Sequence, residues 1–471
     1  MQRLSLCNSM HLKHRVMGPG SGIVAMLSGW IAIAVVGLGT SSGQSLDELA
    51  DGQRDATEAI QAALNESHGF VELPPGKFRI SRPLVIHLPD DGPFELRGRA
   101  TSTLQMFGPG PAIRIEGTHF KSADPAGFSE QIWQAERMPT LQGIAIEGKH
   151  AQADGIEAVG TMQLTLSRLH IRKVRHGVRL VENNRNILFA NCHIYECSGV
   201  GILYDDVNLH QSNIIGCHVS YCGGGGIVSR GGNVRNIHIT GCDIEGNMSP
   251  DQDPTANILI DCRGSEYGTA EVAITGCTIQ HSDAAAGSAN IRIIGQSDPT
   301  VGGVSNREGN ITISGNVLSD VKTNVHLESC RGVTLTGNTF WMGFEHNLLV
   351  TKSSHIIMGP NNFDRNPRYA YGHSQDAKNR ILIQDCEDCT LVGIHISDIN
   401  HDQPAVTLQR CQRMNVSALT ILDSEIGLYL DDVSSSVFTG CLIRNSRSSD
   451  RAQRLVVAGG FDNIFDASLQ P

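Results

Sequence analysis

Residues 239–254 read ITGCDIEGNMSPDQDP, and the unit at their centre, GCDIE (241–245), recurs along the chain. Apolar and polar residues alternate within each copy, which is the period-two pattern of a β-strand. Neighbouring copies often lie 22 to 25 residues apart, and the longer gaps contain visible insertions. The other copies are NCHIY (191–195), GCHVS (216–220), GCTIQ (276–280), GNVLS (315–319), GNTFW (337–341), PNNFD (360–364) and GCLIR (440–444).

A second short strand follows each copy at a similar offset, as in ILYDDV (202–207) and ILIDCR (258–263). Glycine and asparagine mark the bends between the two. A short period built only from strands predicts a parallel β-helix of roughly a dozen coils, each adding one rung about 4.8 Å above the last. The other solenoid, the leucine-rich repeat, needs an L-x-x-L-x-L frame that is missing here. We therefore predict one all-β domain over residues 45–471.

The second residue of each unit predicts an inward column. It runs through Cys192, Cys217 and Cys242 and continues as asparagine in later copies. Thirteen cysteines in an exported chain first suggest disulfides. Side chains that stack on successive rungs point in parallel, however, and this geometry does not suit a disulfide. We predict a packing ladder of free thiols.

The segment DATEAIQAALNES (55–67) predicts an amphipathic helix that covers the open N-terminal end of the solenoid. Asp55 and Glu58 have the spacing of a capping box. Ile60, Ala63 and Leu64 share one face, which we expect to lie on the core.

The opening DATEAIQAALNES…GFVELPPGKFRIS (55–81) resembles that of the pectate-lyase-like superfamily, which includes polygalacturonases, rhamnogalacturonases and phage tailspikes. The repeated N-I-x-I-x-G-N/C-x-I units resemble the generic repeat of that superfamily, and the resemblance covers nearly all of residues 46–445. It implies a single-stranded right-handed parallel β-helix. It also implies action on a polysaccharide, although the superfamily includes binders and structural proteins. Many β-helices of this kind are trimers, so the resemblance admits a homotrimer.

The polygalacturonase motifs N-T-D, D-D, G-H-G and R-I-K are not found on successive coils. The corresponding stretches are ADGIEA (153–158), RHGVRL (175–180), SGVGIL (198–203) and GGGGIV (223–228). In these stretches only Asp154 and His176 are residues that could belong to such a motif. We keep the neighbourhood of Asp154, His176 and Arg179 as a second location for a site.

The N-terminus predicts export. Arg3, Lys13 and Arg15 precede the apolar run IVAMLSGWIAIAVVGL (23–38), and the small polar stretch GTSSGQS follows. We assign residues 1–44 to a signal peptide or an uncleaved membrane anchor, so the body is secreted, periplasmic or on the cell surface. The net charge of −11 argues against a nucleic-acid partner.

Chemistry-bearing residues gather in two outward columns on adjacent rungs. An insertion at 246–257 begins directly after them and carries Asp251 and Asp253, and another spans 282–289. Long loops beside a regular scaffold are where sites are built, so we expect both to wall a groove over the His193–His218–Asp243 column. The first column is His170, His193, His218 and Asp243, and the second contains Arg172, Tyr195 and Glu245.

Two chemistries fit these columns. A glycosidase would use Asp243 and Glu245 as its carboxyl pair, with Asp251 or Asp253 as an alternative acid. A polysaccharide lyase would use His193 or His218 as the base and Tyr195 as the acid, with Arg172 neutralising an anionic sugar. The remaining site residues, His170, Asp251 and Asp253, would then bind substrate.

No cofactor is firmly indicated by the sequence. The acidic loop suits a divalent cation such as calcium, although it lacks the EF-hand spacing. A different class of function also stays open, namely a non-catalytic glycan-binding or structural surface protein. Such a protein would use aromatic residues to stack on sugars, and the candidates are Trp341, Phe344, Tyr369 and Tyr371.

Overall fold

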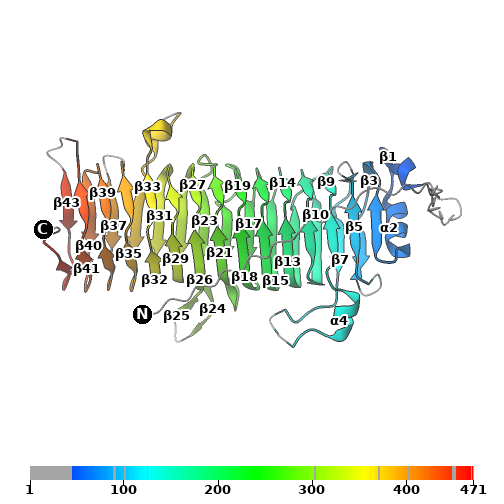
Figure 1. Cartoon of the computed structure of the whole chain (residues 1–471), viewed down its shortest axis with the longest axis horizontal. Coiled ribbons are helices and arrows are strands. Elements are labelled where there is room, and N and C mark those ends of the chain that lie inside the picture. Colours follow the sequence, from blue (N-terminus) through cyan, green and yellow to red (C-terminus); the bar gives the residue numbers. More distant parts are fainter. Residues whose placement is uncertain are drawn as a thin grey trace, which may run out of the picture. The chain divides into compact units, whose positions relative to one another are not determined.

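Short parallel strands stack rung on rung along the described part of the chain (Figure 1). The computed structural model describes residues 45–88, 92–99, 102–122, 124, 126–301, 304–369, 372–399, 403–447, 452–467 and 469. The predicted signal peptide or anchor, residues 1–44, lies outside them. In the part that is described, no helix combines the length and apolarity that a membrane crossing requires.

The first of the two sheets, sheet A, carries one short strand from each coil, and each strand pairs in parallel with the next coil's strand. Fifteen strands in the described residues belong to it. They are β1 Asp51–Asp55, β3 Gly76–Ile80, β6 Ser102–Met106, β9 Ala145–Gly148, β12 His170–Arg172, β14 His193–Tyr195, β16 His218–Ser220, β19 Asp243–Glu245, β22 Thr278–Gln280, β27 Val317–Ser319, β30 Thr339–Phe340, β33 Asn362–Asp364, β36 His395–Ser397, β39 Thr420–Leu422 and β42 Leu442–Arg444.

The second sheet, sheet B, takes up the rest of each coil. Its strands are β2 Phe70–Leu73, β4 Leu84–His87, β5 Glu95–Gly98, β7 Gly110–Glu116, β8 Thr140–Gln142, β10 Ala153–Met162, β11 Thr165–Ser167, β13 Val178–Ala190, β15 Val200–Ile215, β17 Gly225–Arg230, β18 Asn233–Thr240, β20 Ala256–Asp261, β21 Gly268–Thr275, β23 Ala289–Ile294, β26 Gly309–Ser314, β28 Val321–Glu328, β29 Arg331–Thr336, β31 Gly343–Thr351, β32 Ser354–Met358, β34 Arg380–Gln384, β35 Thr390–Val392, β37 Pro404–Gln409, β38 Asn415–Ser417, β40 Ile426–Asp431, β41 Val437–Thr439, β43 Gln453–Val457 and β44 Ile464–Phe465.

Each coil therefore has three strand segments, whereas the sequence predicted two. The third segment is clear at β18, which follows β17 after the bend at Gly231 and Gly232. In the preceding coil both segments belong to one long strand, β15, which pairs with β17 and then with β18. The third segment, such as β18, is followed directly by the next GCxIx unit. The sequence therefore did not distinguish this segment from the strand of that unit.

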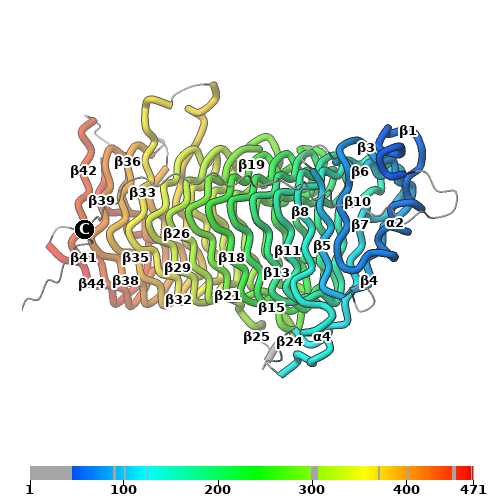
Figure 2. The backbone as a smooth tube through the Cα atoms, turned by 45° about the vertical axis from the view of Figure 1, so that its right-hand side comes forward, coloured from blue at the N-terminus to red at the C-terminus, as the bar shows by residue number. Residues whose placement is uncertain are grey.

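Few elements interrupt the coils. The helices α1 Leu46–Leu49 and α2 Thr57–Glu66 lie at the N-terminal end, and α4 Glu130–Ala135 lies in a loop (Figures 1 and 2). Two short 3₁₀ turns, η1 Pro367–Tyr369 and η2 Ser374–Asp376, lie in another loop, and β24 Gln296–Val301 with β25 Val304–Arg307 forms an antiparallel hairpin.

Helix α2 confirms the predicted cap, but the predicted capping box is wrong. Ile60 and Leu64 are fully buried against the core, as their spacing required. The helix starts one residue later than a capping box at Asp55 needs, with Ala56 at the N-cap position. Asp55 accepts a hydrogen bond from the Thr57 amide (2.9 Å), and Glu58 turns away to pair with Arg82 (2.5 Å).

The inward column is a hydrogen-bonded ladder. The backbone amide of Cys192 donates to the Cys217 sulfur, and the amide of Cys217 donates to the Cys242 sulfur, each at 3.4 Å. Asparagine continues the ladder, since the Asn316 amide donates to Oδ1 of Asn338 and the Asn338 amide to Oδ1 of Asn361, each at 3.0 Å. All twelve cysteines of the described chain are buried and free, which confirms the prediction.

A second buried ladder follows at the turn after sheet A. It begins where the Cys222 amide donates to Oδ1 of Asn247 (3.1 Å). The Nδ2 groups of Asn247, Asn257, Asn290 and Asn324 each donate to the Oδ1 of the next asparagine at 2.7 to 2.9 Å, the last being Asn347. The ladder thereby satisfies the Cys222 amide and links the buried asparagine side chains of successive coils.

The ladder predicts a large stability cost at Asn338. Asn338→Leu would leave the Asn316 amide and the side-chain bonds around it without partners in a buried column. We expect a loss of about 3 kcal/mol in unfolding free energy. Asn362→Leu, in the next unit but on the exposed side of its strand, is the matched control and should cost under about 0.5 kcal/mol. Urea unfolding followed by circular dichroism measures both, and equal midpoints would contradict the ladder.

Candidate functional site

The outward face of sheet A carries the predicted columns in the predicted register. His170 pairs in register with His193, His193 with His218, and His218 with Asp243. In the second column, Arg172 lies opposite Tyr195, and two rungs further on lies Glu245. The sequence therefore placed these side chains correctly on four adjacent rungs.

The two columns meet through a chain of polar contacts. Asp243 Oδ2 lies 3.6 Å from His218 Nε2. The other nitrogen of His218, Nδ1, lies 3.3 Å from the Tyr195 hydroxyl, which also lies 3.4 Å from His193 Nδ1. The two imidazole rings are 4.9 Å apart. Four side chains from three rungs thus form one continuous relay.

The relay favours one set of proton positions. A carboxylate only accepts, so Asp243 favours a hydrogen on His218 Nε2 and a lone pair on its Nδ1. The Tyr195 hydroxyl then donates to His218 and accepts from His193 Nδ1. This leaves a lone pair on His193 Nε2, and that side chain is exposed. The relay therefore presents one free basic nitrogen at the surface.

The surroundings favour the uncharged forms of His193 and Tyr195. Burial lowers the pKa of His193, and the neighbouring imidazoles of His218 and His170 lower it further. Burial raises the pKa of Tyr195, and the Glu245 carboxylate adds to this effect. A neutral imidazole thus lies beside a protonated phenol, as acid–base chemistry near pH 7 requires.

A third column, which the sequence reading missed, lies at the end of each sheet A strand. Its residues take left-handed backbone conformations that turn the chain sharply out of the strand. A bulky residue is uncommon in that region, yet Tyr221 (φ 61°) and His281 (φ 71°) occupy it. In the sequence, a position of this column is the single residue between a GCxIx-type unit and the next buried residue, as Tyr221 is between GCHVS (216–220) and Cys222. The column is Lys173, Glu196, Tyr221, Gly246, His281 and Asp320.

The third column fixes the carboxylate of Glu245. The Tyr221 hydroxyl donates to Oε1 (3.3 Å), and Gln280 Nε2 donates to Oε2 (3.0 Å). His281 lies between two carboxyls, with Nε2 3.8 Å from Glu245 and Nδ1 3.9 Å from Asp320. Burial raises the pKa of Asp320. Glu245 is therefore held more firmly than Asp243, which is 53% exposed.

The arginines expected near an anionic sugar are mostly engaged. Arg172 pairs with Glu196 at 3.3 Å on the surface. Arg179 pairs with Glu157 (2.8 Å) and Asp205 (2.6 Å). Arg172 therefore does not offer an unpaired charge, and neither does Arg179.

The second location considered from sequence has a structural role. Asp154 is 1% exposed, accepts two bonds from Arg175 (2.9 and 2.6 Å) and one from the His176 amide (3.0 Å). His176 Nδ1 accepts from the Val200 amide (3.2 Å). These groups are fully used in holding adjacent coils together.

The two insertions lie side by side, as predicted. Met248 of the first packs with Ala285 of the second in a small apolar cluster. The first loop runs back over earlier turns, since the Ser249 amide donates to Gly223 O (3.1 Å). Among the described residues, no bond joins the side chains of Asp251 or Asp253 to the columns. The cavity nearest the columns is lined by other segments, so the loops do not wall it.

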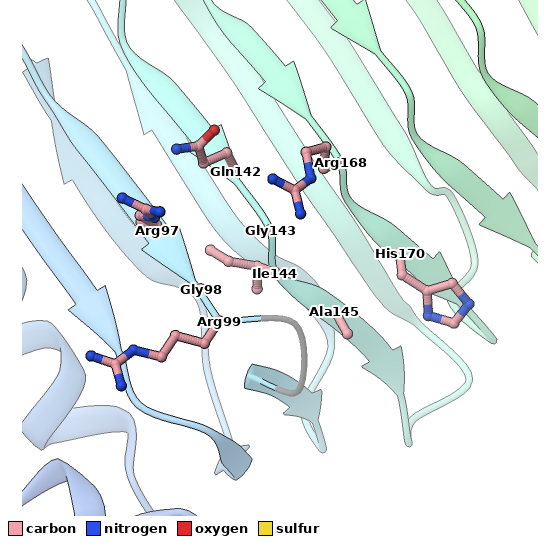
Figure 3. Close-up of a pocket in the computed structure, with 9 residues that line it drawn as sticks. All are labelled: Arg97, Gly98, Arg99, Gln142, Gly143, Ile144, Ala145, Arg168 and His170. Carbon is pink, nitrogen blue, oxygen red and sulfur yellow. The ribbon is translucent and has the colours of Figure 1, made fainter.

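That cavity is basic and lies where the columns begin (Figure 3). It has a volume of about 290 Å³, and its lining includes Arg97, Arg99, Arg168, Gln142 and His170. Arg99 pairs with Glu72 (3.2 Å), which lies outside the lining.

The other two arginines of the cavity, Arg97 and Arg168, form no direct ion pair in the described chain. Within the described chain no carboxylate lies within ion-pair distance of Arg97 or Arg168. Gly98 and Gly143 also line the cavity, and the two coils pack closely there, since a Cβ on Gly98 would lie 2.6 Å from the Gly143 carbonyl oxygen. A cavity lined by positive and uncharged groups favours an anion.

Metal ligation finds little support in the side chains. The described residues contain no group of three or more His, Cys, Asp or Glu that is arranged to hold a metal ion. Burial raises the pKa of the Cys330 thiol to about 12 and that of Cys411 to about 11, whereas metal ligation needs a thiolate. The calcium site expected at the acidic loop stays a prediction.

Two family descriptions match parts of the chain. Residues 133–267 match a right-handed β-helix region, and residues 257–452 match the periplasmic copper-binding protein NosD. The buried thiols do not fit a copper site, so we derive no chemistry from that name. No curated protein matches the chain by sequence.

Solved structures with the same fold include phage tailspikes. Two mutant forms of the tailspike of E. coli bacteriophage HK620, in complex with pentasaccharide, align at TM-scores of 0.53 and 0.52. Both are 12% identical, and the alignments cover 88% and 89% of this chain and 76% and 78% of the tailspike.

Tailspike protein 3 of bacteriophage CBA120 aligns at a TM-score of 0.51 with 13% identity, covering 90% of this chain. This chain spans 63% of that tailspike and 66% of the Dettilon tailspike. Together with the matched β-helix region, these alignments confirm the predicted right-handed parallel β-helix.

The relay predicts a measurable coupling between its imidazoles. Because His218 contributes to the lowered pKa of His193, His218→Gln should raise the pKa of His193 toward its ordinary value. The rise should be only partial, since burial is the larger cause. His395→Gln, on the same face but remote, is the control and should leave that pKa unchanged. Histidine-selective NMR titration measures it, and an unchanged His193 pKa in His218→Gln would refute the coupling.

Proposed function

We propose that this right-handed parallel β-helix protein is exported and cleaves an acidic polysaccharide by β-elimination on the outward face of sheet A. The observation that carries the proposal is the Asp243–His218–Tyr195–His193 relay. It places a neutral base beside a protonated acid on adjacent rungs. The pentasaccharide of the HK620 tailspike complexes supports a glycan ligand for this fold, but not the chemistry.

The relay can supply both proton transfers. His193 Nε2 takes the proton from the carbon next to the uronate carboxylate. The electron pair forms a carbon–carbon double bond, and the bond to the leaving glycosidic oxygen breaks. The Tyr195 hydroxyl turns from His218 and gives its proton to that oxygen. The His193 imidazolium then returns a proton from Nδ1 to the Tyr195 oxygen across 3.4 Å.

The basic cavity supports an acidic substrate. Arg97 and Arg168 lie beside His170, the first member of the histidine column. A chain bound along sheet A would therefore place a neighbouring carboxylate or sulfate near unpaired positive charge. This cavity takes over the neutralising role that the sequence assigned to Arg172.

Hydrolysis is a second candidate, and a specific observation favours it. The Glu245 carboxylate is fixed by Tyr221 and Gln280, while burial raises the pKa of Asp320. One held carboxylate and one carboxyl with a raised pKa resemble the pair that glycosidases use. Both candidate reactions would take place on the same face of sheet A. They can be distinguished by which side chains are needed for turnover.

Two sets of variants separate the chemistries. For β-elimination, we expect Tyr195→Phe and His193→Gln to lower turnover at least about a hundredfold. Glu245→Gln should then cost under about tenfold, since it removes only a neighbour. Product is followed by the ultraviolet absorbance of unsaturated uronates and, separately, by new reducing ends. Hydrolysis would reverse the ranking and give reducing ends without absorbance. Wild-type turnover in all three variants would overturn the site.

The basic cavity yields a separate prediction. Arg97→Gln combined with Arg168→Gln should raise KM for polygalacturonate or alginate about tenfold, with kcat nearly unchanged, and should weaken the effect of added salt. The control is Arg137→Gln, an exposed arginine that donates only to the Trp133 carbonyl (3.3 Å). If the double variant and the control show the same KM, the cavity does not bind substrate.

A further inference from the structure

A second cavity lies several rungs beyond the relay, where turns leave sheet A. It has a volume of about 320 Å³ and lies between the turn after β30 and the loop after β33. We propose that it binds one sugar ring of the same polysaccharide, as a subsite remote from the reacting bond. The inference rests on the proposed function in taking the ligand to be a polysaccharide, but it does not depend on how that polysaccharide is cleaved.

The loop that forms the cavity is held in place from both sides. Arg365 Nη2 donates to the Ser374 carbonyl (2.8 Å) and closes the base of the loop. His373 Nε2 lies 2.8 Å from Asp283 Oδ2, on the second insertion (282–289), and the His373 ring stacks on Phe344 at 5.0 Å. The loop projects at the yellow coils in Figures 1 and 2. These contacts tie the described residues of the loop to neighbouring segments.

The lining has the two kinds of group that a pyranose needs. Trp341 and Tyr369 lie 5.1 Å apart at 41°, and Tyr369 is 47% exposed. Their faces suit the apolar C–H side of a sugar ring. The rim carries planar polar groups that suit hydroxyls, namely Asn366, Gln375 and the ion pair of Arg447 with Asp398.

The cavity continues the face that holds the relay. The strands β19, β22, β27 and β30 are paired in sequence, so Glu245 and Trp341 lie three rungs apart. Three rungs correspond to about 14 Å along the axis. The third column also reaches it, since the Asp320 amide donates to the Met342 carbonyl (3.1 Å). A polymer aligned with the axis would occupy both places, and a short fragment would reach only one.

Tryptophan fluorescence gives a direct readout of this subsite. Trp30, Trp133 and Trp341 are the three tryptophans of the chain. With Trp30→Phe and Trp133→Phe, emission reports Trp341 alone. In a Glu245→Gln, Tyr195→Phe background that does not cleave, we titrate polygalacturonate, alginate and dextran. We expect a saturable change in emission with at least one polymer and no change with its disaccharide.

Affinity measurements complete the test. Tyr369→Ala should weaken retention of that polymer in affinity electrophoresis by about tenfold, from the lost stacking contact. Tyr267→Ala removes a similarly exposed tyrosine far from the cavity and should change nothing.

The outcomes separate this inference from the proposed function. Unchanged Trp341 emission with all three polymers, or equal retention of Tyr369→Ala and wild type, overturns the subsite even if the relay variants abolish cleavage. If Tyr369→Ala weakens binding while the relay variants leave cleavage intact, the subsite stands and the proposed chemistry fails.

Discussion

The structure depends on the hydrogen bond that a buried backbone amide on one rung donates to a side chain on the next. At each sharp turn the chain leaves the sheet ladder, and an amide there would otherwise be buried without a partner. Cysteine sulfur and asparagine oxygen supply that partner at 2.9 to 3.5 Å from Cys192 to Asn361. Because the acceptor must recur at the same point of every coil, the turns recur there too.

The recurring turns set the outward columns. Each strand of sheet A has only two or three residues in most coils, so it exposes one or two side chains before the chain bends. Stacking then brings residues about 25 positions apart into contact, as with Tyr195 and His218. The bend itself contributes the third column. Tyr221 and His281 occupy this left-handed position, and their side chains reach Glu245. The same turn therefore serves the packing of the coil and positions the Glu245 carboxylate.

The sequence predicted which side chains point outward from the strands, but it missed the side chains at the turns and the ion pairs between coils. The unit GCxIx placed His170, His193, His218 and Asp243 in register, because a two-residue period leaves no freedom about the face. The same reasoning overlooked His281 and Asp320, since each occupies the left-handed turn position after its strand, where the alternation of the strand no longer sets the direction of a side chain. The pairing of the arginines could not be predicted for another reason. Whether Arg172 or Arg97 is free depends on carboxylates from other coils, and those pairs leave no mark in local sequence.

A ladder of identical side chains does not by itself determine which coil stacks on which. Cys192, Cys217 and Cys242 make the same bond, so a coil that docked one rung out of place would find an equally good acceptor. The insertions remove this ambiguity. Met248 packs on Ala285, and His373 reaches Asp283, only when each coil occupies its own rung. The loops beside the candidate site thus also serve as register marks for assembly, and shortening them would threaten the order of the coils as well as the surface they carry.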